Sequence, residues 1–215
     1  MIIFIYLLSF VIYRELKERP MKFTIPNQLT ILRVMLSPVF VYFFSFGSFE
    51  QRLTGAVIFV LAALTDWYDG LIARKYGVIT RFGQFADPLA DKILVLSAFF
   101  LFAWLKFISL WMVLIISFRD IFMTLIRIYA IKKNMPVVTH SLGKWKTFLQ
   151  MTFVVFVIIY YTVLSYFYPV LPSHYLKVYY IEIFLFIITL ITVYTLIVYI
   201  KENFQLIVKF FQEWY

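Results

Sequence analysis

The long apolar stretches of the chain constrain its fold most, because each has a length that can cross a bilayer. Six such segments follow Pro26, and each approaches the roughly 20 residues that a spanning helix needs. They cover residues 28–47, 52–73, 84–105, 108–131, 147–171 and 176–200. The chain is 64% hydrophobic, well above the roughly 45–50% of soluble domains. We therefore predict an all-α integral membrane protein with six transmembrane helices.

The two ends of the chain differ from these segments. Residues 1–13 are apolar but shorter than a spanning helix, and basic residues follow them, whereas a signal peptide has its basic residues first. Residues 1–20 are therefore either a juxtamembrane, interfacial helix or an extension that precedes a start at Met21. Residues 202–215 combine apolar side chains with polar ones such as Lys209, Gln212 and Glu213, which predicts an amphipathic helix on the membrane surface. Residues 21–201, between these two terminal segments, are expected to form one membrane domain.

The basic residues predict the orientation in the membrane. Thirteen of the twenty Lys and Arg residues fall on one side of the six segments and three on the other. Basic loops favour the cytoplasmic side, so both termini and the turn between residues 66 and 91 are expected in the cytoplasm. The net charge of +9 follows this topology and accompanies no nucleic-acid motif. Membrane lipid is the expected partner, and nucleic acid is not.

Four of the chain's eleven acidic residues are clustered where the second and third segments meet. A carboxylate at membrane depth costs about 2.5–3.5 kcal/mol, so four together need compensating positive charge. Asp66 and Asp69 share one helix face, and Asp87 and Asp91 lie one turn apart on the next helix. The chain has no cysteine and only two histidines, which argues against a thiolate or His-rich site. We predict a carboxylate site for a pair of divalent cations.

A second group of charged residues lies in the fourth segment and just before the fifth. Arg119 is in mid-span beside Asp120, and Lys144 and Lys146 lie at the cytoplasmic mouth. A structural ion pair of Arg119 with Asp120 is one alternative, and a simple contribution of the lysines to the positive-inside bias is another. A metal site that faces a basic pocket has the charge layout of a phosphoryl-transfer enzyme with two phosphorylated substrates.

The acidic cluster resembles the signature of the CDP-alcohol phosphotransferases. All eight defining positions are present, as Asp66-x2-Asp69-Gly70-x2-Ala73-Arg74-x8-Gly83-x3-Asp87-x3-Asp91. Residues 25–33, 87–92 and 143–150 further resemble members that use CDP-diacylglycerol and glycerol 3-phosphate. The resemblance covers about residues 22–150. One departure is Phe118-Arg119-Asp120, which stands where Gly-Arg-Glu is expected.

The resemblance implies a role for each matching position. Asp66, Asp69 and Asp87 would bind two divalent cations, Mg²⁺ or Mn²⁺. Asp91 would be the general base and is also counted among the metal ligands. CDP-diacylglycerol would be bound by Asn27, Thr30, Asp66, Asp69, Gly70, Ala73, Arg74 and Gly83. The phosphate of the acceptor would be bound by Arg119, Lys144 and Lys146.

The expected reaction transfers the phosphatidyl group to glycerol 3-phosphate and releases CMP. The resemblance implies a homodimer in a bacterial cell membrane, with the active site facing the cytoplasm. Another acceptor, such as inositol phosphate or serine, is the alternative within the family. A carboxylate-lined cation or proton transporter is the alternative from another class, and release of CMP would distinguish the two.

Overall fold

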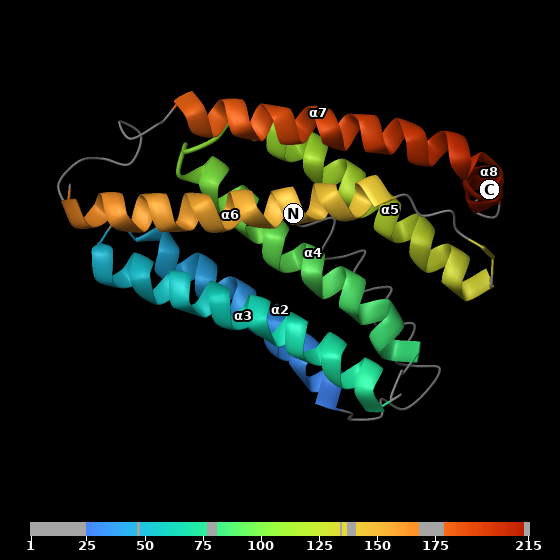
Figure 1. Cartoon of the computed structure of the whole chain (residues 1–215), viewed down its shortest axis with the longest axis horizontal. Coiled ribbons are helices and arrows are strands. Elements are labelled where there is room, and N and C mark those ends of the chain that lie inside the picture. Colours follow the sequence, from blue (N-terminus) through green and yellow to red (C-terminus); the bar gives the residue numbers. More distant parts are fainter. Residues whose placement is uncertain are drawn as a thin grey trace.

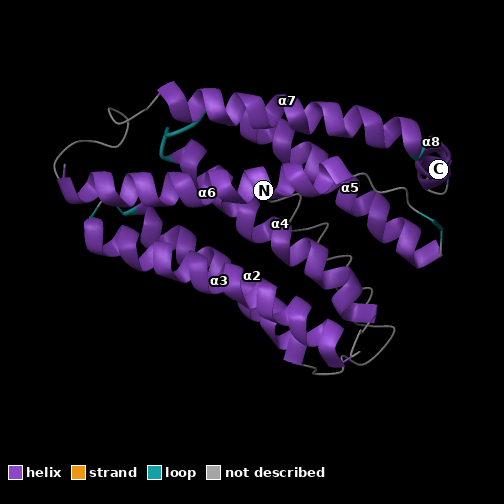
Figure 2. Cartoon of the chain, in the orientation of Figure 1, coloured by secondary structure: helices purple, strands orange, loops and turns teal. Residues whose placement is uncertain are grey.

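The computed structural model describes residues 25–46, 48–76, 81–133, 135–136, 141–167 and 179–212. Within these ranges the chain is entirely helical, without strands (Figures 1 and 2). The helices are α2 (Ile25–Ser45), α3 (Phe49–Tyr76), α4 (Arg81–Trp104), α5 (Leu110–Lys133), α6 (Ser141–Phe167), α7 (Tyr179–Glu202) and α8 (Phe204–Gln212). Inside these helices, the side chains of residues 25–27, 66–76, 81–88, 132, 141–142 and 144 lie outside the described part. The expectation for residues 1–20 also lies outside it.

The six predicted segments correspond to the six helices α2–α7. The largest difference is at α6, which begins at Ser141 and not at residue 147, because an apolar pattern does not detect a polar first turn. In the described part, three helices are long and apolar enough to cross a membrane, within Gln28–Ser45, Trp145–Phe167 and Tyr179–Glu202. Helices α3, α4 and α5 have 28, 24 and 24 residues, but they carry most of the candidate site's charges. In the described part, an all-helical chain with three helices able to cross a membrane is thus confirmed, and the count of six spans stays a prediction.

Helices α2 and α3 lie side by side along much of their length (Figure 1). Helix α6 packs on α3 and α7, and α5 packs on α4 and α7. The α2–α3 contact is close at Gly55, where an added Cβ would lie 2.9 Å from the backbone nitrogen of Phe44. Glycine therefore lets the two helix backbones approach each other here.

We expect Gly55→Ala to lower the stability of the protein by about 1–3 kcal/mol, the usual cost of overpacking a core. The new methyl group meets backbone atoms of α2, which can yield only if the helices separate. A thermal melt in detergent measures the effect. Gly143→Ala is the matched control, since no atom lies within 4 Å of a Cβ added there. Equal melting temperatures for the two variants would contradict close packing at Gly55.

A buried cation joins α3 to α6 at the end of the bundle that lies away from the α3–α4 turn. Arg52 is only 4% exposed. Its guanidinium donates to the carbonyl of Tyr161 at 3.3 Å and to the hydroxyl of Ser165. It also lies 5.6 Å and 6.0 Å from the ring centroids of Phe107 and Phe44, within the range of cation–π attraction. These contacts compensate part of the cost of burying the charge.

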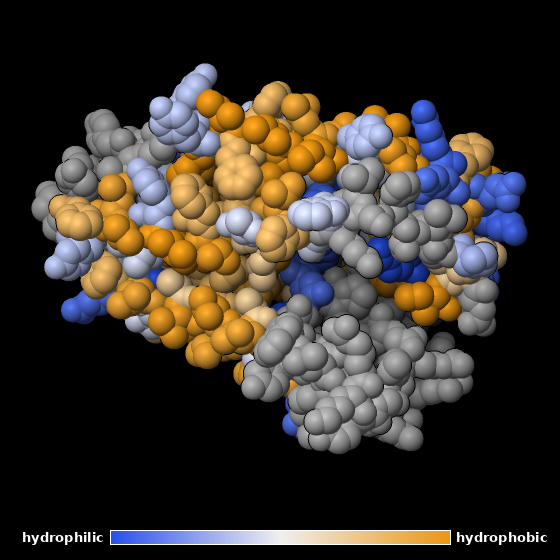
Figure 3. All heavy atoms as spheres, viewed as in Figure 1, coloured by the Kyte–Doolittle hydropathy of each residue, from blue (hydrophilic) through white to orange (hydrophobic). Residues whose placement is uncertain are grey.

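Large apolar side chains remain exposed around the bundle. They include Met35 on α2, Leu61 on α3, Phe148 on α6 and Tyr194 on α7. Figure 3 shows hydrophobic residues over much of the described surface, with hydrophilic ones gathered at the end where α7 meets α8. Soluble proteins rarely expose so extensive an apolar surface, so this surface suits contact with lipid tails.

The expected amphipathic tail is a helix, but it does not turn its whole apolar face outward. Leu206 and Ile207 of α8 are buried in a cluster with Ile126 of α5 and Tyr199 of α7. Phe204 and Phe211 of the same helix stay exposed. The tail therefore packs partly on the protein, because α5 and α7 offer it an apolar surface.

Glu182 is an acidic residue in the first turn of the otherwise apolar helix α7. In the structure Ser109 donates a hydrogen bond to its carboxylate at 2.5 Å. Ser109 directly precedes α5, so Glu182 fastens the start of α5 to α7. A carboxylate near a helix N-terminus is also favoured by the helix dipole.

Candidate active site

The acidic motif lies at the adjoining ends of α3 and α4. Helix α3 carries Asp66, Asp69, Gly70, Ala73 and Arg74 in its last turns, and α4 carries Gly83, Asp87 and Asp91. Only residues 77–80 separate the two helices, so both helix ends lie at one end of the bundle (Figure 1). Of the four predicted metal ligands, Asp91 alone has a described side chain. Convergence of the four carboxylates therefore stays a prediction, and no group of three metal-binding side chains occurs among those described.

Asp91 forms an ion pair with Arg33 of α2. The Arg33 side chain is fully buried, whereas the Asp91 side chain is 44% exposed. Sequence reasoning missed this pair, although a cation inside a predicted span is a signal for a partner. Thr30 lies one turn before Arg33 and is also buried, while the side chain of Asn27 is outside the described part. The ion pair restrains the carboxylate that was predicted to be the base.

A cavity of about 690 Å³ opens beside Asp91. It lies between α4, α5, α6 and α7, with Arg33 of α2 and Ala63 of α3 also in its wall. One part of the wall is charged, with Asp91, Lys92, Arg119 and Asp120; another is apolar, with Leu94, Val95, Met123, Phe148 and Met151. The volume is within the range of small-molecule sites. A small anionic ligand could lie in it between the basic residues and Asp91.

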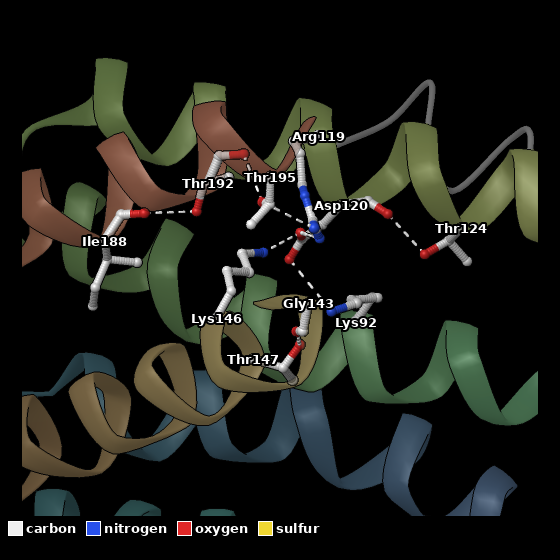
Figure 4. A network of polar contacts seen from close by, with 10 residues as sticks. All are labelled: Lys92, Arg119, Asp120, Thr124, Gly143, Lys146, Thr147, Ile188, Thr192 and Thr195. Atoms are coloured by element: carbon white, nitrogen blue, oxygen red, sulfur yellow. Dashed lines mark hydrogen bonds and ion pairs between the residues drawn. The ribbon is translucent and has the colours of Figure 1, made fainter. Parts of the chain in front are cut away.

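A buried carboxylate organises the basic side of this cavity (Figure 4). Asp120 accepts a hydrogen bond from Arg119 at 3.0 Å and contacts the ammonium of Lys92 at 3.4 Å. Lys146 of α6 donates to the same carboxylate. The second terminal nitrogen of Arg119 donates to the hydroxyl of Thr195 on α7 at 3.1 Å. The network thus links α4, α5, α6 and α7.

The predicted acceptor residues are placed differently from one another. Arg119 lines the cavity, and its ion pair with Asp120 is confirmed. Lys146 is completely buried and directed to Asp120. Lys144 lies in α6, but its side chain is outside the described part. Their direct contact with an acceptor remains a prediction.

Sequence reasoning missed two members of the network. Lys92 was not among the predicted site residues, although its position in a predicted span was a signal for a buried partner. Thr195 gave no signal, because an uncharged threonine in an apolar helix commonly bonds to its own backbone. Thr195 does so as well, donating to the carbonyl of Thr192 at 2.9 Å.

Comparison with known proteins places the chain among enzymes of lipid synthesis. Residues 23–207 match the family model of CDP-alcohol phosphatidyltransferase. A Bacillus subtilis protein named CDP-diacylglycerol–glycerol-3-phosphate 3-phosphatidyltransferase is 36% identical, over 60% of this chain and 72% of its own length. A protein of the same name from Sodalis glossinidius is 41% identical, over 61% of this chain and 74% of its own. A probable phosphatidylglycerophosphate synthase of Mycobacterium tuberculosis is 37% identical, over 58% and 60% of the two chains.

Proposed function

Because the chain belongs to the CDP-alcohol phosphatidyltransferase family, we propose that it transfers the phosphatidyl group of CDP-diacylglycerol to glycerol 3-phosphate. The products are phosphatidylglycerophosphate and CMP, and the enzyme acts in phospholipid biosynthesis. The observation that carries this proposal is the 36–41% identity to proteins named for this reaction. The basic cavity beside Asp91 supports it, because the acceptor is both an alcohol and an anion.

Two divalent cations fit the carboxylate motif. The family is in general dependent on divalent metal ions, and carboxylate oxygens are the ligands that Mg²⁺ and Mn²⁺ prefer. Asp66, Asp69 and Asp87 would hold the two ions, with Asp91 beside them. When bound, the ions neutralise the diphosphate of the donor and polarise the phosphoryl group.

The remaining motif positions frame the donor. Gly70, Ala73 and Gly83 leave room for a ligand close to the helix backbone. The planar guanidinium of Arg74 can bind two phosphate oxygens at once. Asn27 and Thr30 of α2 border the nucleotide in this arrangement, and the acyl chains remain in the bilayer.

Asp91 acts on the acceptor as general base. It takes the proton from the 1-hydroxyl of glycerol 3-phosphate while that oxygen forms a bond to the β-phosphorus of CDP-diacylglycerol. The bond between this phosphorus and the bridging oxygen breaks, and CMP leaves with the electron pair. Arg33 keeps the carboxylate of Asp91 oriented through their ion pair. Arg119 and Lys144 supply positive charge that attracts the acceptor's phosphate, and Lys146 contributes through its ion pair with Asp120.

Helices α2–α7 would cross the membrane six times, with both termini and the active site on the cytoplasmic side of a bacterial cell membrane. The distribution of Lys and Arg, thirteen against three, supports this orientation. Residues 21–201 would form the membrane domain, and 202–215 would lie at the membrane surface. We also propose a homodimer, which cross-linking in native membranes would test.

An acceptor screen tests the proposed reaction. Purified protein with CDP-diacylglycerol and Mn²⁺ should release CMP with glycerol 3-phosphate, and at least about tenfold more slowly with inositol phosphate or serine. The reason is that a pocket built for one acceptor leaves polar groups unpaired with another. CMP is measured by chromatography, and the lipid product by mass spectrometry.

Two results would contradict the proposal in different ways. A faster reaction with inositol phosphate or serine would keep the family but change the acceptor. Absence of CMP release with every acceptor, together with cation or proton flux in liposomes, would favour the transporter. Protein without added metal serves as the control for background hydrolysis.

A further inference from the structure

Asp120 is one of two fully buried charges in the described part of the cavity wall, the other being Arg33. Three cations from three helices surround the Asp120 side chain: Lys92 on α4, Arg119 on α5 and Lys146 on α6. Removing one partner from a buried cluster of ion pairs is costly, because a buried charge is left uncompensated. The carboxylate is therefore the common counter-charge of this cluster.

The three cations differ in their access to the cavity. The Lys92 side chain is 17% exposed, that of Arg119 is 6% exposed and that of Lys146 is fully buried. Lys92 and Arg119 line the cavity, and Lys146 is not among the described lining residues. Seen from the cavity, Lys146 thus lies behind Asp120. Figure 4 shows its side chain extending from α6 to the Asp120 carboxylate.

The charges of the cluster do not cancel. Three cations around one carboxylate leave two positive charges. A phosphate monoester carries about −1.5 to −2 charges at neutral pH, so the excess is matched by one such group. Charge complementarity of this kind selects for a phosphorylated ligand over a neutral one.

We propose that Lys92, together with Arg119, binds the acceptor's phosphate, and that Asp120 is a positioning residue that holds both at the cavity wall. Lys146 acts through Asp120 by neutralising it from behind. Thr195 restrains Arg119 from the opposite side through its 3.1 Å hydrogen bond. This inference rests on the proposed function, because it takes the acceptor to be a phosphorylated alcohol.

The first test is the apparent KM of purified variants for each substrate. Lys92→Met and Asp120→Asn are expected to raise the KM for glycerol 3-phosphate about tenfold or more, the usual effect of losing a charge-assisted bond. The KM for CDP-diacylglycerol should stay within about twofold, since Asp120 lies outside the donor motif. Asp120→Glu, which keeps the charge, should recover most of the acceptor affinity. Lys209→Met is the control, because Lys209 is an exposed lysine on α8.

A double variant tests whether Lys146 acts through Asp120. Asp120→Asn with Lys146→Met should be no worse for the acceptor KM than the more affected single variant, because both changes disrupt one linkage. If the effects of the two single substitutions on the acceptor KM add fully in the double variant, the indirect role of Lys146 is overturned. Thermal melts with and without glycerol 3-phosphate show whether each variant is folded and whether the ligand still stabilises it.

Thr195→Val keeps the test decisive if Asp120→Asn does not fold. It removes the hydrogen bond to Arg119 without changing any charge, and it should raise the acceptor KM severalfold. An unchanged acceptor KM in Lys92→Met would overturn its binding role. A parental acceptor KM in Asp120→Asn or Thr195→Val would overturn the positioning role. A lower acceptor KM would overturn it as well, and in Asp120→Asn it would mean that the carboxylate competes with the acceptor's phosphate. If the parent protein prefers a different phosphorylated acceptor, the proposed function fails, and the same variants test the inference with that acceptor.

Discussion

Asp91→Asn is expected to lower kcat by about 10²–10⁴-fold, the usual contribution of a positioned general base. An alcohol is a poor nucleophile until its proton is removed, and asparagine keeps the shape of the side chain without its basicity. Binding of CDP-diacylglycerol and metal should stay near the parental value. Turnover assays run beside isothermal titration with a non-reacting donor analogue at fixed Mn²⁺ would show this contrast.

The same substitution also removes the ion pair between Asp91 and the buried Arg33. A thermal melt is therefore needed, and turnover should be expressed per folded protein. Glu50→Gln is the matched control, because Glu50 is an exposed carboxylate in the first turn of α3, outside the motif. Near-parental turnover of Asp91→Asn would show that the base lies elsewhere. Complete loss of metal binding would show that Asp91 is a structural ligand.

Asp66→Asn and Asp87→Asn are expected to abolish turnover by a different route. Each removes a carboxylate that we propose to be a metal ligand, so Mn²⁺ affinity should fall, and donor affinity should fall with it. The reason is that, without the metal ions, the negative charge of the donor's diphosphate is not neutralised in the site. The titration used for Asp91→Asn measures both affinities. Raising Mn²⁺ should recover part of the activity of these two variants but none of that of Asp91→Asn.

The opposite pattern would contradict this assignment. If Asp66→Asn and Asp87→Asn bind Mn²⁺ and the donor analogue as the parent does, the motif carboxylates do not hold the ions. The proposed division between ligands and base would then be wrong. The family assignment would not depend on this result, because it rests on sequence similarity over residues 23–207.

The sequence predicted the helices well because apolar segments of the right length have few other structures available in a bilayer. All six segments correspond to helices, and the tail helix was also predicted. The errors have physical causes. The polar first turn of α6 has no hydropathy signal, and the burial of Leu206 and Ile207 depends on which helices happen to lie beside α8.

The site was predictable where it depends on neighbours in sequence. The motif positions fall on α3 and α4, and the adjacent Arg119 and Asp120 form the ion pair that was considered. Contacts between distant helices were not predictable in this way. Arg33 lies 58 residues from Asp91, and a helical period shows which face a residue occupies but not which helix packs against that face.

The buried Arg52 has a consequence for the order in which the protein can assemble. Its partners Tyr161 and Ser165 follow it by 109 and 113 residues. While the chain is being synthesised, at roughly 5–20 residues per second, α3 is complete several seconds before these partners exist. The guanidinium must meanwhile be hydrated or held by lipid head groups, since burying it alone would be costly. The end of α3 that carries Arg52 therefore reaches its final packing only after α6 has been made, although α2 and α3 are neighbours in the chain.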